Sequence, residues 1–202
     1  MRPDVWVRAI DTSAAHCAAA LLCGDRLAVR VEDMAKGQAE RLVPMVNELL
    51  AAEGVTMADI GLIGVGVGPG NFTGIRISVA LARGLALGLG VPAVGVTGFE
   101  ALADGPGWVV LPAPRGQVYA QRFGPAPEAA MICEAVEAGG VEAGGVEGRV
   151  THLADVTVAQ FVTAIGRVAR AKAIAPQPRP APFYLRGADA APASDPPPVI
   201  LP

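Results

Sequence analysis

Apolar residues alternate with small or polar ones in the first part of this chain. The alternation covers residues 5–10, 16–22 and 27–31, each long enough for one strand. Turn-forming residues separate these runs, including Gly24 and Asp25 between the second and the third. Three short runs joined by tight turns predict an antiparallel meander.

The spacing then changes to that of a helix. Residues 38–53 carry apolar side chains three and four positions apart, and Gly54 fits the helix stop. Pro44 must lie in the first turn of this helix or kink it. The predicted apolar face consists of Leu42, Met45, Val46, Leu49 and Leu50.

A strand, a helix and a strand follow. Residues 60–67 form a short run rich in β-branched residues, typical of a buried parallel strand. Residues 73–89 have a helical pattern, and residues 91–96 predict another strand. The pattern by itself indicates a mixed α/β fold with helices packed on a sheet.

The second half has weaker signals. Residues 108–113 and 118–123 predict strands around a turn at Arg115-Gly116, and residues 156–173 predict a helix. The side chains expected to point inward from that helix are Val158, Phe161, Val162, Ile165 and Val168.

Two segments are poor in regular pattern. Residues 136–145 repeat Val-Glu-Ala-Gly-Gly twice, which is typical of a tolerated surface loop. Proline dominates from Ala175 onward, so this tail is expected to be extended and partly mobile.

Composition excludes several classes. The chain has 202 residues, is 52% hydrophobic and 17% charged, and carries a net charge of −3. This is a globular composition without the basic stripe expected of a direct tRNA binder. Its three cysteines have no metal spacing and are expected as core thiols in a reducing cytosol. The start of the chain lacks a signal-peptide pattern, and no apolar run is long and unbroken enough to predict a membrane span.

The glycine-rich stretch from Gly64 to Arg76 is the strongest local signal. It passes from a predicted strand into a predicted helix, with Thr73 placed as the helix N-cap. Such a turn is a natural anion site, because free amides and the helix dipole point the same way. It lacks the lysine of a P-loop, and its Gly68, Gly70 and Gly74 miss the dinucleotide spacing. The alternative is a purely structural strand-to-helix turn.

Other polar residues give little catalytic signal. Asp11 ends the first strand, where it is either a turn-former or a phosphate-side carboxylate. His16 and His152 are the only histidines, and neither has a ligand at metal spacing, so both are expected to be structural. We therefore expect neither a metal site nor a Ser-His-Asp set.

Six motifs, taken together, resemble the TsaB (YeaZ) family of tRNA threonylcarbamoyladenosine biosynthesis proteins. Residues 68–76, Gly-Pro-Gly-Asn-Phe-Thr-Gly-Ile-Arg, are similar to the family's GPGSFTGLR. The other five occur in the family's order, at residues 9–13, 40–44, 84–92, 95–102 and 182–186. The resemblance is dense from residue 5 to 103 and sparse afterwards.

The resemblance implies a fold and a set of candidate sites. The fold would be a duplicated ribonuclease-H-like α/β fold of the actin, Hsp70 and sugar-kinase superfamily with two lobes. Residues 1–103 would form the first lobe, with the TsaD-binding helices, and residues 104–202 a shortened second lobe with a Pro-rich tail. A relic of an ancestral ATP site would fall on Asp11, Thr12, Ser13, Gly68, Gly70, Asn71, Thr73 and Gly74.

The resemblance also implies a function. The chain would be a cytoplasmic, non-catalytic subunit that binds and positions TsaD, which transfers threonylcarbamoyl to the tRNA adenosine beside the anticodon. The ATPase TsaE would dock on the pair, tRNA would be contacted indirectly, and ATP or ADP would bind only in the complex. Homodimers can form through the same surface when TsaD is absent. The interface candidates are Leu42, Met45, Val46, Leu49, Arg76, Val79, Ala80, Arg83 and Leu87.

Three positions depart from the family. Gln38 replaces its usual histidine, and in the DARRGEVY motif Pro112 and Gln117 replace two carboxylates. Two rival functions remain open: an ATP-dependent phosphotransferase using Asp11, Thr12 and residues 68–74, and a homodimeric nucleotide-binding regulator.

Overall fold

The computed structural model describes residues 5–134 and 149–186. Its larger sheet has five strands in the order β3-β2-β1-β4-β5. The first three form the expected antiparallel meander, and the last two run parallel to β1. These strands are β1 (Trp6–Asp11), β2 (His16–Cys23), β3 (Arg26–Asp33), β4 (Ile60–Gly66) and β5 (Ala93–Val96).

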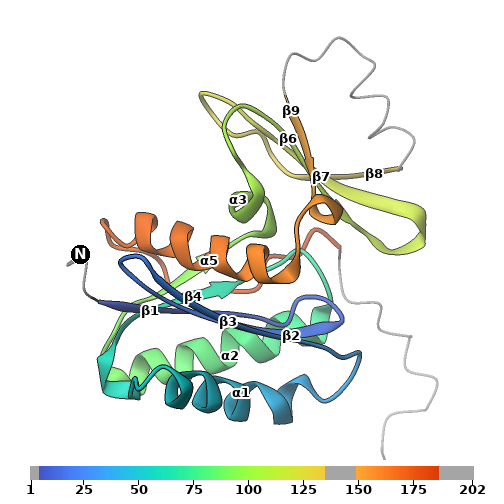
Figure 1. The fold of residues 1–202 in the computed structure, drawn as a ribbon. Coiled ribbons are helices and arrows are strands. Elements are labelled where there is room, and N and C mark those ends of the chain that lie inside the picture. Colours follow the sequence, from blue (N-terminus) through green and yellow to red (C-terminus); the bar gives the residue numbers. More distant parts are fainter. Residues whose placement is uncertain (1–4, 135–148, 187–202) are drawn as a thin grey trace, which may run out of the picture.

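Helices cover both faces of this sheet (Figure 1). The helices α1 (Gln38–Ala52) and α2 (Phe72–Leu89) lie side by side on one face, and α5 (Val158–Lys172) crosses the other. Side chains of β1 point alternately to the two faces of the sheet. Ile10 packs with α1 and α2, whereas Val7 and Ala9 pack with α5. Burial on both faces explains why β2 and β4 are almost wholly apolar, whereas β1 also buries Arg8 and Asp11.

The helix α5 lies unusually close to the sheet. A Cβ added at Gly64 of β4 would lie 2.8 Å from the Ala169 Cβ of α5, and one at Gly166 would lie 2.5 Å from a Leu22 methyl. Glycine at both positions therefore permits the close approach of helix and strand.

A second sheet stands above α5 in Figure 1. Its order is β8-β7-β6-β9, with antiparallel pairing among β6, β7 and β8 and parallel pairing of β9 to β6. The same order and directions occur in β3-β2-β1-β4 of the first sheet. The second-sheet strands are β6 (Gly107–Pro112), β7 (Gln117–Phe123), β8 (Met131–Glu134) and β9 (Arg149–His152), and the short helix α3 (Gly98–Leu102) joins the two sheets.

Most strands and all three long helices were predicted within a few residues. The parallel setting of residues 60–66 and the turn at Arg115-Gly116 are confirmed. Pro44 lies in the interior of α1, not in its first turn. The sequence patterns missed α3, β8 and β9, which are all five residues long or shorter.

The predicted N-cap of α2 was wrong. Asn71, not Thr73, caps the helix, and its side chain accepts a hydrogen bond from the Gly74 amide at 2.8 Å. Both residue types are good caps. The chain turns into the helix two residues earlier than the apolar pattern suggested.

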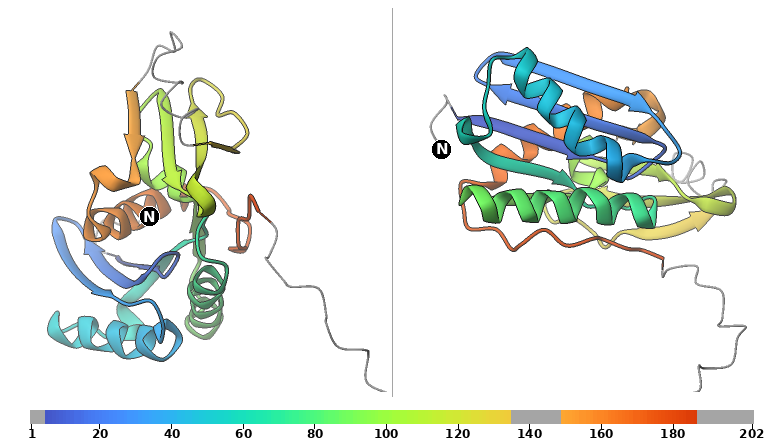
Figure 2. Two further views of the ribbon diagram at one scale, coloured as in Figure 1. Left: turned by 90° about the vertical axis from the view of Figure 1, so that its right-hand side faces the viewer. Right: turned by 90° about the horizontal axis from the view of Figure 1, so that it is seen from below.

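The proline-rich segment after α5 has a defined path up to residue 186. It runs beside α2 in an extended form, and the Phe183 amide donates to the Val67 carbonyl at 2.7 Å (Figure 2). We call residues 173–186 the C-terminal strap. Residues 136–145 and those beyond 186 lie outside the described residues. The division at residue 103 stays a prediction, and α5 from the second half packs on the first sheet.

Candidate functional site

Two loops meet at the carboxyl ends of β1 and β4. The turn after β1 carries Asp11, Thr12 and Ser13, and the loop after β4 carries the glycine-rich motif. The Thr12 hydroxyl donates to the Gly74 carbonyl at 2.7 Å, and the Asn71 amide donates to the Ser13 carbonyl at 2.6 Å. Hydrogen bonds therefore join Thr12 and Ser13 to Asn71 and Gly74, four of the predicted nucleotide-loop residues.

Asp11 is the centre of a buried polar cluster. Its Oδ2 accepts from the Ser13 amide at 3.1 Å and the Ser13 hydroxyl at 2.9 Å, and lies 2.7 Å from His16 Nε2. His16, expected to be isolated, is thus paired. A serine nucleophile needs its hydroxyl to donate to the histidine. Here both groups face the same carboxylate oxygen, so Ser13 lacks a base and the cluster is not arranged for acyl transfer.

The glycines of the loop are packed against the β1 turn. A Cβ at Gly74 would overlap the Thr12 carbonyl oxygen, one at Gly70 would overlap the Ser13 carbonyl oxygen, and one at Gly66 would overlap Asp11 Oδ1. Gly68 is the glycine of this motif with a positive φ, 103°. The constraint on Gly70 is its close approach to Ser13 and not a positive φ. Space beside these glycines is filled by the protein itself, which favours a structural role for the loop.

An open crevice of about 450 Å³ lies beside this unit, between the two sheets. Ser13, Asn71 and Gln38 supply its polar groups, while the strand-end residues of β6 and the start of α5 supply apolar walls. None of its lining residues is Lys or Arg. Phosphate sites use cations or helix N-terminal amides, and here the Gly74 amide is already taken by Asn71. Among the described residues, no group of three or more His, Cys, Asp or Glu could hold a metal ion.

The expected partner interface divides into core and surface. Five of its candidates are buried with at most 6% exposure and face the sheet, so a partner cannot reach them in this fold. This corrects the interface assignment of Leu42, Met45, Val46, Leu49 and Val79, whose helical spacing marks the core side of α1 and α2. Four candidates are exposed on one stripe of α2: Arg76, Ala80, Arg83 and Leu87. We call this stripe the outer face of α2.

The outer face combines two arginines with small residues and one exposed large apolar side chain, Leu87. The 18 residues of α2 have a mean hydropathy of 1.4, yet only 28% of them are buried. By length and composition α2 could cross a membrane, but Ile75 and Ala82 pack into the sheet as in the core helix of a globular domain. Leu87 is 86% exposed, and a Cβ at Gly84 or Gly88 would meet no atom within 4 Å. The surface is therefore flat around Gly84 and Gly88, and its charges are those of Arg76 and Arg83.

Arg76 is held in place by the C-terminal strap. Its guanidinium lies 3.8 Å from the centroid of the Phe72 ring, and its Nε donates to the Tyr184 hydroxyl at 3.0 Å. Such stacking restrains a long side chain that would otherwise sample many rotamers. The N-terminal end of the outer face is thus built jointly by α2 and the strap.

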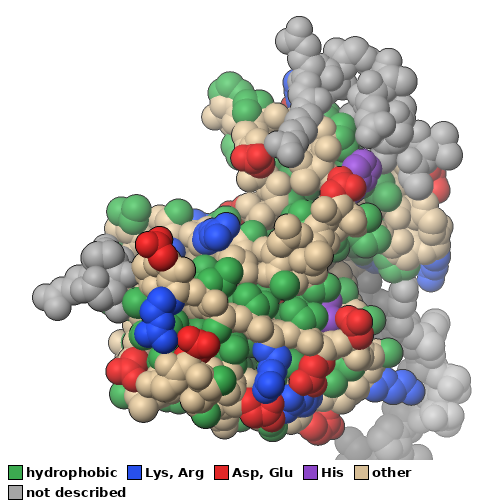
Figure 3. All heavy atoms as spheres, in the orientation of Figure 1, with side chains coloured by type: hydrophobic (Ala, Val, Ile, Leu, Met, Phe, Trp, Pro, Cys, Tyr) green, Lys and Arg blue, Asp and Glu red, His purple; other side chains and the backbone are tan. Residues whose placement is uncertain are grey.

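The second motif of the resemblance, residues 40–44, has a structural role. Arg41 binds Glu32 of β3 at 2.5 and 2.6 Å and Glu48 of α1 at 2.7 and 2.8 Å. These hydrogen bonds hold the pKa of both carboxyl groups below their usual range and raise the pKa of Arg41. Figure 3 shows charges of both signs side by side over α1 and β3, so no basic stripe forms on this face.

Sequence reasoning missed the pairing of His16 and the role of Tyr184. The first had a signal, because Asp11 and His16 flank a four-residue hairpin connection. The role of Tyr184 had no signal beyond the motif at residues 182–186, because the proline-rich composition of the tail does not indicate which part of the protein it contacts.

The fold is that of an α/β protein with two mixed sheets, and it fits the actin, Hsp70 and sugar-kinase class. Comparison with known proteins agrees. Residues 29–123 match the TsaD family, described as tRNA N6-adenosine threonylcarbamoyltransferase. The chain is 36% identical over 99 residues to the tRNA threonylcarbamoyladenosine biosynthesis protein TsaB of Escherichia coli, covering 49% of this chain and 43% of TsaB. An uncharacterised protein of Mycobacterium tuberculosis is 39% identical over 137 residues, covering 61% of this chain and 65% of that protein.

Solved structures show the same relationship over a longer span. YeaZ from Pseudomonas aeruginosa superposes with a TM-score of 0.67 at 25% identity, covering 90% of this chain and all of the YeaZ chain. The resemblance to TsaB and YeaZ that the motifs indicate is therefore confirmed. The aligned region spans less than half the length of the Escherichia coli TsaB that it matches.

Proposed function

We propose that this chain is a non-catalytic, cytoplasmic subunit of the assembly that installs threonylcarbamoyl on the tRNA adenosine beside the anticodon. It would bind and position a TsaD-type transferase, with a TsaE-type ATPase docking on the pair. The outer face of α2 carries this proposal, because Leu87 is 86% exposed there and the small residues beside it leave the helix backbone open to a partner.

The flatness of that face suits a helical partner. Ala80, Gly84 and Gly88 are four residues apart and exposed, so a second helix can approach the backbone closely. Arg76, Arg83 and Leu87 flank this row and would contact side chains of the partner. The same face would support a homodimer when TsaD is absent.

The crevice supports the non-catalytic part of the proposal. It has no lining cation, and the candidate phosphate groups already bond to one another. The net charge of −3 supports a partner, and not this chain, as the tRNA binder. ATP or ADP would then bind only in the complex. A phosphotransferase, the rival, would need a phosphate site that the described residues of this crevice do not offer.

The repeated strand order supports a duplicated ribonuclease-H-like fold. In each sheet three antiparallel strands are followed by a fourth that is parallel to the first, and a helix comes next in the chain. We infer that the second lobe is the shortened copy, since its sheet lacks a counterpart of β5 among the described residues.

The test is complementation of cells depleted of this protein, with threonylcarbamoyladenosine in total tRNA measured by nucleoside mass spectrometry. Ala80→Glu puts a charge at the centre of the outer face and should fail to restore the nucleoside. Ala171→Glu makes the same change at an exposed position of α5 and should restore it. Full restoration by Ala80→Glu would contradict the proposal, as would micromolar ATP binding by the isolated chain.

A further inference from the structure

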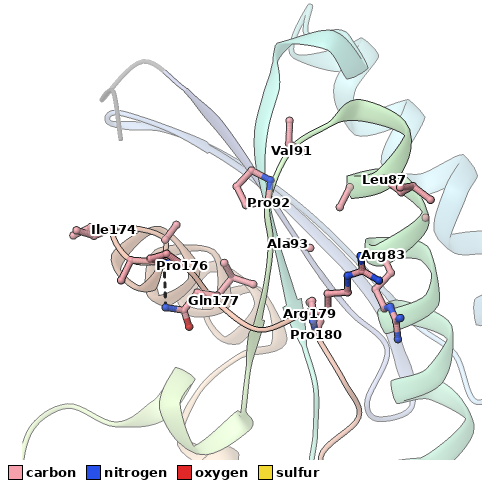
Figure 4. Close-up of a pocket in the computed structure, with 15 residues that line it drawn as sticks. Arg83, Leu87, Val91, Pro92, Ala93, Ile174, Pro176, Gln177, Arg179 and Pro180 are labelled. Carbon is pink, nitrogen blue, oxygen red and sulfur yellow. Dashed lines mark hydrogen bonds between the residues drawn. The ribbon is translucent and has the colours of Figure 1, made fainter.

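A second open groove lies between the C-terminal half of α2 and the C-terminal strap (Figure 4). Its volume is about 760 Å³, larger than the crevice beside Asp11. The residues before and within β5 form its floor, and Pro92, Pro176 and Pro180 stiffen its walls. Conformationally restricted prolines keep the walls preformed, so little ordering entropy opposes binding there.

Large apolar side chains stand on both rims of this groove. Leu87 on the α2 side is 86% exposed, and Ile174 on the strap side is 83% exposed. A small ligand in the groove would leave both rims in water, because small-molecule sites enclose most of their ligand. A longer occupant that extends over the rims would bury them and gain about 1.5–3 kcal/mol for each fully covered side chain.

The groove carries positive charge without a counter-charge. Arg83 and Arg179 lie near one another at its α2 side (Figure 4), and none of the fifteen lining residues is Asp or Glu. Neither arginine forms an ion pair within the described residues. Two guanidinium groups beside an apolar surface are suited to carboxylates, which they can bind in a bidentate fashion.

The floor offers main-chain groups as well. β5 is the edge strand of the first sheet, and the carbonyl of Pro92, just before β5, accepts from the Ile63 amide of β4 at 3.0 Å. Pairing groups alternate along a strand, so the main-chain groups of Ala93 point away from β4 and toward the open edge. Lys172 Nζ already donates to the Gly95 carbonyl at 3.0 Å, so an extended peptide can pair with this edge only at Ala93.

We propose that this groove binds an extended peptide segment of a partner protein in which acidic residues alternate with large apolar ones. The apolar side chains lie between Leu87 and Ile174, and the carboxylates bind Arg83 and Arg179. This site goes beyond the proposed helix-to-helix contact, since Ile174 and Arg179 lie outside the outer face of α2.

The experiment is fluorescence anisotropy with the full chain and a fluorescein-labelled peptide of alternating leucine and glutamate, with proline at both ends against self-association. We expect saturable binding that weakens with salt. A leucine–lysine peptide and a serine–glutamate peptide should each bind at least tenfold more weakly. Equal binding of all three peptides would overturn the proposal.

Variants locate the site without touching the outer face of α2. Arg179→Glu and Ile174→Asp should each weaken peptide binding at least tenfold, while Arg167→Glu, a matched charge reversal on exposed α5, should leave it unchanged. Both groove variants should still bind TsaD, which separates this proposal from the proposed function. Unchanged peptide binding by Arg179→Glu and Ile174→Asp would overturn it. If removal of residues 187–202 raises the affinity tenfold, the occupant is the chain's own end and a partner segment is ruled out.

Discussion

The ring of Tyr184 stacks on the ring of Phe72, with centroids 4.7 Å apart and an angle of 27° between the planes. Phe72 begins α2, and Tyr184 lies near the end of the described C-terminal strap. Arg76 contacts both residues: its guanidinium stacks on the Phe72 ring, and its Nε donates a hydrogen bond to the Tyr184 hydroxyl. Two segments far apart in the chain therefore define one edge of the proposed partner surface.

Removing the Tyr184 ring should loosen the strap. We expect Tyr184→Ala to lower the free energy of unfolding by about 1–2 kcal/mol, because it loses the aromatic stack and its buried area. Tyr184→Phe keeps the stack and loses only an exposed hydrogen bond, so its change should stay below about 0.5 kcal/mol. Urea denaturation of the isolated chain measures both. Equal effects of the two variants would show that the hydroxyl, not the ring, anchors the strap.

Arg8 should be a destabilising residue. Its side chain is fully buried in β1, Nε and one terminal nitrogen have no partner among the described residues, and the other terminal nitrogen meets only Met57 Sδ at 3.2 Å. Burial lowers the pKa of Arg8 to about 10, which corresponds to about 3 kcal/mol against the charged form. We expect Arg8→Met to raise the unfolding free energy at pH 8 by about 1–3 kcal/mol.

The stability difference between Arg8→Met and the parent should depend on pH. Above about pH 10 the unfolded chain holds the Arg8 proton more tightly than the folded chain, so the parent protein gains stability as pH rises. The difference in unfolding free energy between Arg8→Met and the parent should therefore decrease by about 1 kcal/mol between pH 8 and 11. Denaturation of both proteins across this range checks the sign, with exposed Arg167→Met as the control. A difference that widens with pH would contradict the account.

Asp11 should act on stability and not on chemistry. Asp11→Ala leaves the buried groups of Ser13 and His16 without their shared acceptor, which should cost about 2–4 kcal/mol. Asp33→Ala, at an exposed position, should cost under about 0.5 kcal/mol. Thermal unfolding measures the effect, and TsaD binding at a temperature where the variant is folded should match the parent. A stable Asp11→Ala that no longer supports nucleotide-dependent assembly would instead favour the phosphate-site interpretation.

Two glycines of α2 should respond in opposite directions. Gly74→Ala places a methyl against the Thr12 carbonyl oxygen and should destabilise the chain by more than about 2 kcal/mol. Gly84→Ala meets nothing within 4 Å and should stabilise it by about 0.5–1 kcal/mol through helix propensity. Chemical denaturation measures the unfolding free energy of both variants against the parent. A neutral Gly74→Ala would show that the loop can move away from β1.

The fold was largely predictable because its strands and long helices repeat apolar residues at clear periods. The side of each helix that faces a partner was not, because periodicity marks Leu42 and Val79 as apolar without saying whether the sheet or another protein covers them. Core packing also overrode the cap assignment at Thr73, and Asn71 took that role. The path of the strap depends on contacts between residues far apart in the chain, such as Phe183 with Val67, which no local pattern encodes.

The most direct test of the central claim is the mass of a mixture of this chain with TsaD from the same organism, measured by light scattering behind size exclusion. The account predicts one heterodimer peak with the parent chain and with Ala171→Glu, and separate components with Ala80→Glu. Absence of a complex with the parent chain, or an undiminished complex with Ala80→Glu, would contradict the claim that the outer face of α2 binds the transferase.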